Sequence, residues 1–176
     1  MSTTAAGIQE WALAAGLEGM SQAELVTGYC ERLVAAGLPV WRASVGADTL
    51  HPLIDAQGHR WIAGEGLRVE FFPRLTLRDE NDEWRFSTWK WMLDRGAVEN
   101  RWNLSRGEGA DFFPLLADLA ASGGTDYWTR IVRYGEGAFL GETRGLATSW
   151  ATREPGGFVA VELALIRATL PAFTLA

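Results

Sequence analysis

The sequence predicts an α+β domain in which an antiparallel sheet is flanked by helices from the N- and C-terminal ends of the chain. Residues 8–37 and 159–172 repeat apolar side chains at helical spacing. Most segments between them alternate in polarity and are separated by turns rich in glycine and aspartate. The chain has 176 residues, of which 48% are hydrophobic, enough for one sizeable core. We therefore expect a single domain over residues 1–176.

Two helices are expected before the first strand. Residues 8–17 form a short amphipathic segment. The second helix begins at the capping-box pair Ser21 and Glu24 and has an apolar residue at every fourth position. It ends at Gly37, because glycine readily adopts the left-handed conformation of a helix C-terminus.

The first strands of the sheet are expected after this helix. Residues 40–45 alternate in polarity, so that the apolar side chains lie on one face. The next segment predicts a hairpin, with a strand through Leu53, a turn at residues 55–58 and a return strand over residues 59–62.

The middle of the chain mixes strand and helix patterns. Residues 67–72 alternate like a strand, and residues 78–83 form a charged turn. Residues 83–96 favour one helix closed by a glycine, although their periodicity is ambiguous. Residues 98–105 predict another strand.

The last third of the chain predicts a helix, two strands and a closing helix. Asp111 is a candidate N-cap for a helix that ends at Gly123. Residues 126–134 and 144–152 predict two strands across a glycine-rich loop. An apolar helix follows over about residues 159–172.

Composition excludes several classes of partner. The net charge of −6 argues against nucleic acid and against anionic lipid surfaces. No run reaches the roughly 18 to 20 apolar residues of a membrane span, and the N-terminal segment lacks the pattern of a signal peptide. Cys30 is the only cysteine, which excludes an internal disulfide and suits a reducing compartment. We therefore expect a soluble cytoplasmic protein that binds neither nucleic acid nor membrane.

Three blocks of the sequence carry a resemblance to a known family. They are AAGLPVWRASVGADTLHP, FFPLLADLAASGGTDYW and LATSWATREPGGFVAVELALI. In this order they resemble the N-terminal GAF-like sensory or regulatory domain of bacterial class III adenylate/guanylate cyclases. The matching motif positions are Gly37, Leu38, Pro39, Arg42, Ser44, His51, Pro52, Gly124, Thr125, Asp126, Tyr127, Pro155, Gly156, Gly157 and Phe158.

The resemblance implies a non-catalytic GAF-like domain that controls a downstream cyclase catalytic domain. That catalytic domain would follow the closing helix and is absent from this chain. The sequence departs from the family in its middle, where residues 71–103 are unusually rich in tryptophan, and at Val159 and Ala160, where the family usually has small polar residues. A ligand located in the middle region therefore does not transfer from the family.

The residues themselves supply no catalytic or metal-binding constellation. A class III cyclase needs two metal-binding aspartates and groups that position the phosphates, and the acidic residues of the 78–83 segment are better explained as a solvated turn. His51 and His59 offer a metal or haem site as the less favoured alternative, because no third ligand stands at a recognisable spacing.

The candidate nucleophiles are explained by structure. Cys30 is expected to be a buried structural residue, because its neighbours would not lower a thiol pKa. Ser105, Ser122 and Ser149 lack a nucleophile-elbow motif. The chain is therefore expected to be a regulatory domain, and an independent enzyme is the least favoured interpretation.

Aromatic density indicates where a small molecule would bind. Sensory domains hold ligands between the sheet and the crossover helices, so we expect a pocket between the sheet and residues 71–123. Packing of the same aromatic side chains into the core is the alternative. The sequence indicates no particular ligand or cofactor. The candidate lining residues are Trp61, Trp89, Trp91, Trp102, Phe113 and Tyr127.

The terminal helices predict a parallel homodimer. The first helix is expected to expose Ile8 and Trp11. The closing helix has two apolar stripes, of which one sheet face can bury only one. An intramolecular pair of the two terminal helices is the alternative arrangement. A ligand-free dimerisation module is accordingly the alternative function. The stripes are Val161, Leu165 and Ala168, and Leu163, Ile166 and Leu170.

Overall fold

The computed structural model describes residues 4–48, 54–73, 82–133 and 145–176. Six strands form one sheet in the order β3-β2-β1-β6-β5-β4, and every neighbouring pair is antiparallel. Together with the helices at both ends of the chain, the sheet confirms the predicted α+β class. The strands are β1 Arg42–Asp48, β2 Ile54–Ile62, β3 Gly66–Pro73, β4 Glu99–Asn103, β5 Asp126–Arg133 and β6 Gly145–Thr152.

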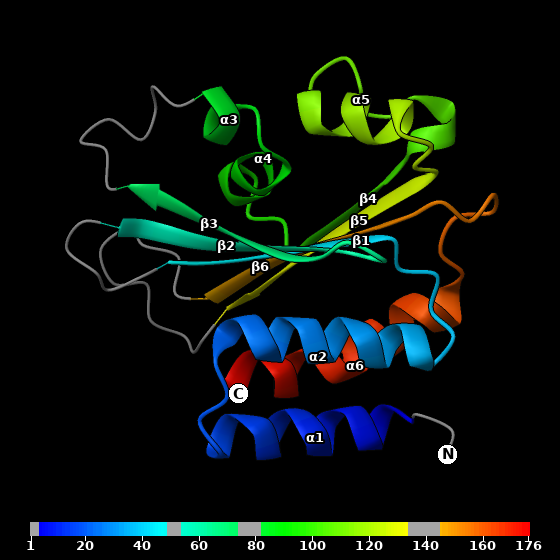
Figure 1. Cartoon of the computed structure of the whole chain (residues 1–176). Helices are drawn as coiled ribbons and strands as arrows, with labels where there is room; N and C mark the ends of the chain where they lie inside the picture. The colour runs from blue at the N-terminus through cyan, green and yellow to red at the C-terminus, as the bar shows by residue number, and fades with distance from the viewer. Residues whose placement is uncertain (1–3, 49–53, 74–81, 134–144) are drawn as a thin grey trace.

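Helices cover both faces of the sheet (Figure 1). The terminal helices α2 and α6 lie against one face, and α1 lies outside them as a further layer. The three helices from the middle of the chain, α3, α4 and α5, lie on the opposite face. The helices are α1 Ala5–Leu17, α2 Gln22–Ala35, α3 Asp82–Arg85, α4 Thr88–Asp94, α5 Pro114–Ala121 and α6 Ala160–Leu175.

The predicted end signals of α2 are confirmed. The Ser21 side chain accepts a hydrogen bond from the Glu24 backbone N–H, and the Glu24 carboxylate accepts one from the Ser21 backbone N–H at 3.0 Å. At the other end, Gly37 has a φ of 92°, and Leu38 donates its backbone N–H to the Leu33 carbonyl at 3.1 Å. Local sequence alone therefore specifies both ends of this helix.

The predicted turn at residues 55–58 is wrong. These residues belong to β2, where Ala56, Gln57 and Gly58 pair with β1. The tight turn lies instead between β2 and β3, where Gly64 and Gly66 have φ values of 82° and 87°. Asp55 and Gly58 are common turn residues, but pairing with strands on both sides overrides this local preference.

The single helix predicted over residues 83–96 is also wrong. The segment forms two short helices, α3 and α4, and Ser87 begins the second by accepting a hydrogen bond from the Lys90 N–H at 3.0 Å. A serine with an extended backbone competes with helix continuation by capping the next turn. Similarly, Phe113 rather than Asp111 is the N-cap of α5, with Pro114 in its first turn. The glycine closing α4, Gly96, has the positive φ expected of it.

The core between the sheet and the terminal helices is large and partly aromatic. Trp128 and Trp150 project from neighbouring strands, and Tyr29 of α2 stacks on Phe173 of α6 with ring centroids 4.4 Å apart. The Tyr29 hydroxyl and the Thr169 hydroxyl share a hydrogen bond of 2.7 Å. Burial raises the pKa of the Tyr29 phenol, so this polar link remains neutral.

The terminal helices form an intramolecular pair. Gln9 of α1 donates its side-chain amide to the Ala168 carbonyl of α6 at 2.7 Å. The prediction that Ile8 is exposed is therefore wrong: α6 and α2 bury it completely, because α1 packs onto them. Trp11 is half-buried, with the Arg32 guanidinium 3.7 Å above its ring.

Two polar clusters connect α6 to the far edge of the sheet. Glu99 of β4 accepts hydrogen bonds from Arg167 of α6 at 2.9 Å and from Arg130 of β5 at 2.5 Å. Buried Asp126 of β5 accepts from Arg101 and from the backbone N–H of Phe158, which precedes α6. These contacts connect β4 and β5 both to the residue before α6 and to the middle of α6.

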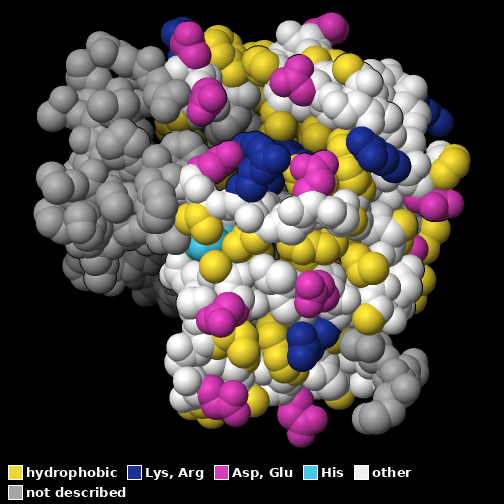
Figure 2. All heavy atoms as spheres, in the orientation of Figure 1, with side chains coloured by type: hydrophobic (Ala, Val, Ile, Leu, Met, Phe, Trp, Pro, Cys, Tyr) yellow, Lys and Arg dark blue, Asp and Glu magenta, His cyan; other side chains and the backbone are white. Residues whose placement is uncertain are grey.

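The described helices and the visible face bear on membrane and polyanion partners. Among the described helices, none is long and apolar enough to cross a membrane. On the face seen in Figure 2, basic side chains lie beside acidic ones instead of forming a continuous basic patch. This distribution suits the net charge of −6.

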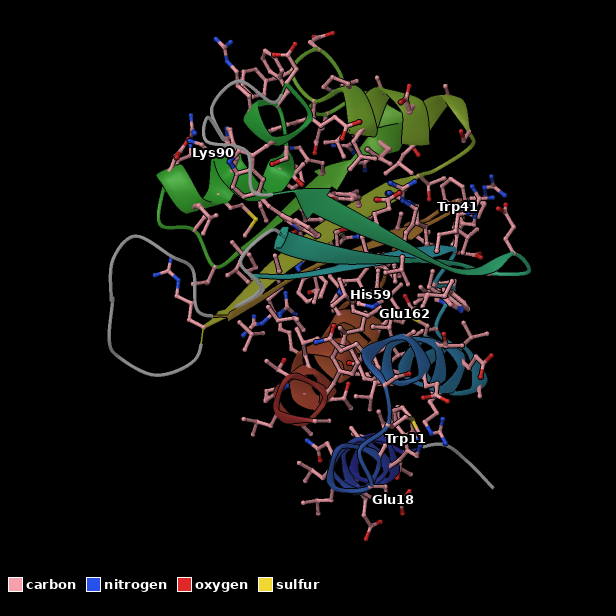
Figure 3. All side chains as sticks on the ribbon, turned by 60° about the vertical axis from the view of Figure 1, so that its left-hand side comes forward. Trp11, Glu18, Trp41, His59, Lys90 and Glu162 are labelled. Atoms are coloured by element: carbon pink, nitrogen blue, oxygen red, sulfur yellow. The ribbon has the colours of Figure 1, made fainter. Side chains whose placement is uncertain are left out.

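The buried His59 of β2 predicts a pH-dependent stability. Figure 3 shows His59 on the side of the sheet that faces α2 and α6, and burial lowers its pKa from the ordinary value of 6.5. Protonation is therefore easier in the unfolded chain, so the free energy of unfolding should fall as the pH drops below about 6.5. In His59→Gln the slope between pH 7 and pH 5 should be smaller, as measured by urea unfolding at each pH. Equal slopes in both proteins would contradict this assignment.

Candidate functional site

A row of polar side chains crosses the face of the sheet that α3, α4 and α5 cover. Strand register places Ser44 of β1 opposite Arg60 of β2 and opposite Ser149 of β6. Side chains alternate between the two faces of a strand, and the flanking Ala43 and Val45 lie in the opposite core. The whole row therefore lies on the α4 side. It consists of Arg68, Arg60, Ser44, Ser149, Thr129 and Asn100.

Two arginines and one carboxylate dominate the charge at the β1–β2–β3 end of this face. Arg42 lies two residues before Ser44 and is 8% exposed. Arg60 donates to Glu70 of β3, with a shortest N–O distance of 2.8 Å. Burial lowers the pKa of Arg42, an effect opposed by Tyr127 and reinforced by the like charge of Arg60. An arginine nevertheless stays protonated at neutral pH, so the face holds a buried positive charge.

Among the described residues, two buried side-chain atoms of this row have no hydrogen-bond partner. They are the Ser44 hydroxyl oxygen and the Nε of Arg60, which belong to residues paired across β1 and β2. Leaving such a group unpaired costs about 1–3 kcal/mol, and most buried polar groups in folded proteins are paired. A polar group of a ligand would therefore find hydrogen-bonding atoms at this position on the sheet.

In the other half of the row, Ser149 and Thr129 have hydrogen-bond partners within the chain. The Tyr127 hydroxyl hydrogen-bonds the Thr88 hydroxyl of α4 at 3.0 Å and also the Ser149 side chain. Burial raises the pKa of Tyr127, which keeps the phenol neutral. Thr129 donates its hydroxyl to the Thr148 carbonyl at 2.8 Å. Together with the bond from Trp89 to Thr129, these contacts hold α4 on the sheet.

Trp89 of α4 lies against the polar row, on the same face of the sheet. Its indole N–H donates to the Thr129 hydroxyl at 3.1 Å. Its six-membered ring lies over Gly46, where a Cβ would be only 2.6 Å from Cζ3 of the ring. Gly46 is thus the residue that allows the indole to lie directly on β1, two positions from Ser44 on the same face.

Four of the six predicted lining residues form one aromatic cluster. Trp102 is at its centre, with ring centroids 5.8 Å from Trp91, 5.4 Å from Phe113 and 5.8 Å from Tyr127. Trp102, Phe113 and Tyr127 are buried with Leu116 and Leu119 of α5. This packing attaches α5 and α4 to the β4 edge. It corresponds to the alternative in which these aromatic side chains pack into the core.

Trp61 is not part of this side of the molecule. It lies opposite Ala43 on the face of β2 that packs against the terminal helices, where it is 6% exposed. Its assignment to the pocket is wrong, because a pattern of aromatic residues does not say which face a strand presents to which layer. Trp89 remains beside the polar row, apart from the other four.

The remaining sequence candidates lie elsewhere. Cys30 is buried in the core of the terminal helices, and burial raises the pKa of its thiol, as expected of a structural cysteine. His51 falls outside the described residues, as do the first two acidic residues of the 78–83 segment. Within the described ranges, no group of three or more His, Cys, Asp or Glu side chains could hold a metal ion. Ser105 and Ser122 are exposed, far along the chain from the described histidine.

A hollow of about 430 Å³ lies where the chain enters β1, just before Arg42. Trp41 forms its floor, and the Arg153 guanidinium lies 3.7 Å above that ring. Figure 3 shows Trp41 near the end of the sheet, away from Lys90 of α4. The hollow offers a wide, open surface without unpartnered buried atoms among its described residues.

The sequence interpretation missed the arginine and serine residues of the polar row as a site. The signal was present in β1, because Arg42 and Ser44 alternate there with the apolar residues Ala43 and Val45. On a sheet covered on both faces, such polar positions are buried and therefore informative. From the sequence, Arg42 and Ser44 are identified only as positions of the family motif.

The two serines of the row predict opposite effects on stability. Ser44→Ala removes an unpartnered hydroxyl and should raise the free energy of unfolding by about 1 kcal/mol. Ser149→Ala removes a partner of buried Tyr127 and should lower the free energy of unfolding by about 1 kcal/mol. Parallel urea unfolding of the two variants tests this difference. Equal losses in both variants would show that the Ser44 hydroxyl is satisfied.

No protein-family model matches this chain, and no curated protein matches it significantly. The fold and the residues of the polar row are therefore the basis for assigning a function.

Proposed function

We propose that the chain is a non-catalytic regulatory domain that binds a small molecule between the sheet and the helices α3 and α4. The observation that carries this proposal is the pair of unpartnered buried atoms, the Ser44 hydroxyl and the Arg60 Nε. Unpaired buried polar groups lower the stability of the folded chain, and they are typical of functional sites. A bound ligand supplies the missing hydrogen bonds there. We further propose, from the sequence resemblance, that the regulated partner is a class III nucleotide cyclase domain.

The arrangement of layers supports a sensory role. The terminal helices α1, α2 and α6 lie on one face, and the described helices on the proposed binding face, α3, α4 and α5, are all short (Figure 1). Short helices have few hydrogen bonds of their own, so their position depends on what lies beneath them. A bound molecule would therefore act first on α4 and on the sheet.

A route from the sheet to α6 is present in the polar contacts. Thr129 of β5 bonds Trp89 at the site, and the next residue, Arg130, bonds Glu99, which also holds Arg167 of α6. Thr129 and Arg130 project to opposite faces of the same strand. A ligand that favours one position of Trp89 can bias α6 only through its differential affinity for the two positions.

Activity of a polypeptide that joins this chain to a class III cyclase catalytic domain tests this function. Nucleotide cyclase activity should be measured with and without residues 1–176, across a panel of cellular metabolites. We expect a metabolite that changes activity only when the domain is present. The Thr129→Val variant, which lacks the Trp89 acceptor, should retain basal activity and lose much of the response. The same response with and without the domain would exclude the regulatory role.

A dimerisation module is the second candidate function. One face of α6 is exposed and entirely apolar, although α1 already covers the neighbouring face. Val161 and Leu175 are each 73% exposed at the two ends of this face, and between them lie only Ala164, Ala168 and Pro171. Such a stripe is costly in water and suits a parallel two-fold pairing of α6 with α6.

The oligomeric state tests the second candidate. Light scattering at micromolar concentration should give the mass of a dimer, and Ala168→Glu should convert it to a monomer without unfolding it, because residue 168 is exposed. Ala14→Glu, on the exposed face of α1, is the matched control. A monomer that persists on concentration would exclude the dimer.

A further inference from the structure

The polar row also indicates the chemistry of its ligand, provided that the proposed function is correct. Among the described side chains at the β1–β2–β3 end of this face, Arg42 and Arg60 carry positive charge and Glu70 carries one negative charge. Arg68 continues the row outward and lies 3.7 Å from Glu65. Among the side chains that the structure describes here, the guanidinium charges exceed the carboxylate charges by one.

The unpartnered atoms both have a proton to donate. An arginine Nε carries an N–H and has no acceptor capacity, and a serine hydroxyl donates readily to an anion. Both atoms are buried, and the residues that carry them are paired across β1 and β2, while the Arg60 guanidinium extends to Glu70 of β3. Buried charges are normally paired, and guanidinium groups bind carboxylate and phosphate oxygens with short, charge-assisted hydrogen bonds.

We infer that this end of the row binds the oxyanion of a small organic anion, with Arg42, Arg60 and Ser44 as its contacts and Trp89 beside its apolar body. The carboxylate or phosphate oxygens accept from the Arg60 Nε and the Ser44 hydroxyl, the two donors that are unused. Arg42 supplies the balancing charge from the adjacent row of the same face.

The dimensions of the strand suit a compact ligand. Ser44 and Gly46, which lies beneath the Trp89 ring, are two residues apart on β1. This spacing corresponds to about 7 Å along a strand. An oxyanion at Ser44 therefore places a flat group of the size of one ring against the edge of the indole.

Matched neutral and charged probes test the inference. Benzoate and phenyl phosphate are titrated into the domain, with benzamide as the neutral counterpart of benzoate and inorganic phosphate as the anion without a body. Binding is followed through the Trp89 indole N–H signal in the NMR spectrum, which is assigned by its loss in Trp89→Phe. We expect at least one of the two aromatic anions to bind about tenfold or more tightly than benzamide.

The variants locate the binding. Arg60→Gln and Ser44→Ala should each weaken binding of the preferred anion, by about tenfold for the arginine. Arg106→Gln, an exposed arginine outside the site, should leave binding unchanged. Ser44→Ala keeps the test valid if the arginine variant unfolds. A preference for benzoate over phenyl phosphate assigns a carboxylate, and the reverse preference assigns a phosphate.

The outcomes separate this inference from the proposed function. Equal binding of benzamide and benzoate, unchanged binding in Arg60→Gln and Ser44→Ala, or no binding by any anion at millimolar concentration would each overturn the anion assignment. A neutral metabolite that changes cyclase activity through the domain would overturn it too, while leaving the regulatory role in place. Anion binding without any effect on activity would leave the ligand class correct and remove the regulatory role.

Discussion

Replacing Arg101 with methionine should lower the free energy of unfolding by about 3 kcal/mol, among the largest effects of any polar substitution in the chain. Arg101 donates to both carboxylate oxygens of Asp126, with a shortest distance of 2.7 Å, and to the Phe158 carbonyl at 2.6 Å. Asp126 is 2% exposed, so the substitution leaves a buried carboxylate with one backbone donor. We place the effect at the lower end of the usual range because the Arg101 side chain is 43% exposed.

The partner substitution separates the charge effect from packing. Asp126→Asn keeps the shape of the side chain and leaves Arg101 free to reach water, so it should cost less than Arg101→Met. The double variant should be more stable than the sum of the two losses predicts, because no buried charge remains. Arg106→Met is the control at an exposed arginine. Urea unfolding measures all four proteins, and equal small losses in every one would show that the pair contributes nothing.

Replacing Trp102 with alanine should lower the free energy of unfolding by about 3–5 kcal/mol. Trp102 is 7% exposed and has ring contacts with three other aromatic side chains of the cluster. Edge-to-face ring pairs add to the area that each ring buries. Trp91 of α4 and Phe113 before α5 would lose their common neighbour.

The loss should be local as well as large. Amide hydrogen exchange should increase first in α4, α5 and β4, whereas the core between β6 and the terminal helices should remain protected. Phe112→Ala is the matched control, because Phe112 belongs to the same aromatic region and is 53% exposed. A small loss for Trp102→Ala, or an increase in exchange spread evenly over the chain, would show that the cluster does not attach these helices.

Local sequence determined those elements whose ends depend on neighbouring residues. The capping box of Ser21 and Glu24 and the left-handed Gly37 bound α2 as predicted, because both signals act within one turn of the helix. The strand patterns over β3, β5 and β6 were also sufficient, since alternation follows directly from the two faces of a strand. The burial of Cys30 could be predicted in the same way, from its place on the apolar side of a helix.

Tertiary structure alone decided what depends on partners distant in the chain. Residues 55–58 have turn-forming side chains, but β1 and β3 hold them in a strand. Ile8 is buried because α6, more than 150 positions away, returns beside α1. The position of Trp61 on the opposite face from Trp89 follows from which layer each strand face meets, and local periodicity carries no information about that.

The candidate site also has some features that the sequence shows and others that only the tertiary structure shows. The sequence alone showed which residues alternate with the apolar positions of β1, and it located aromatic residues in the middle of the chain. Only the strand order and register bring Ser44, Arg60 and Ser149 into one row and lay Trp89 over Gly46. Hydrogen-bond satisfaction is a property of three-dimensional neighbours. The unpartnered Ser44 hydroxyl and Arg60 Nε, from which the binding site is inferred, could therefore emerge only once the sheet was assembled.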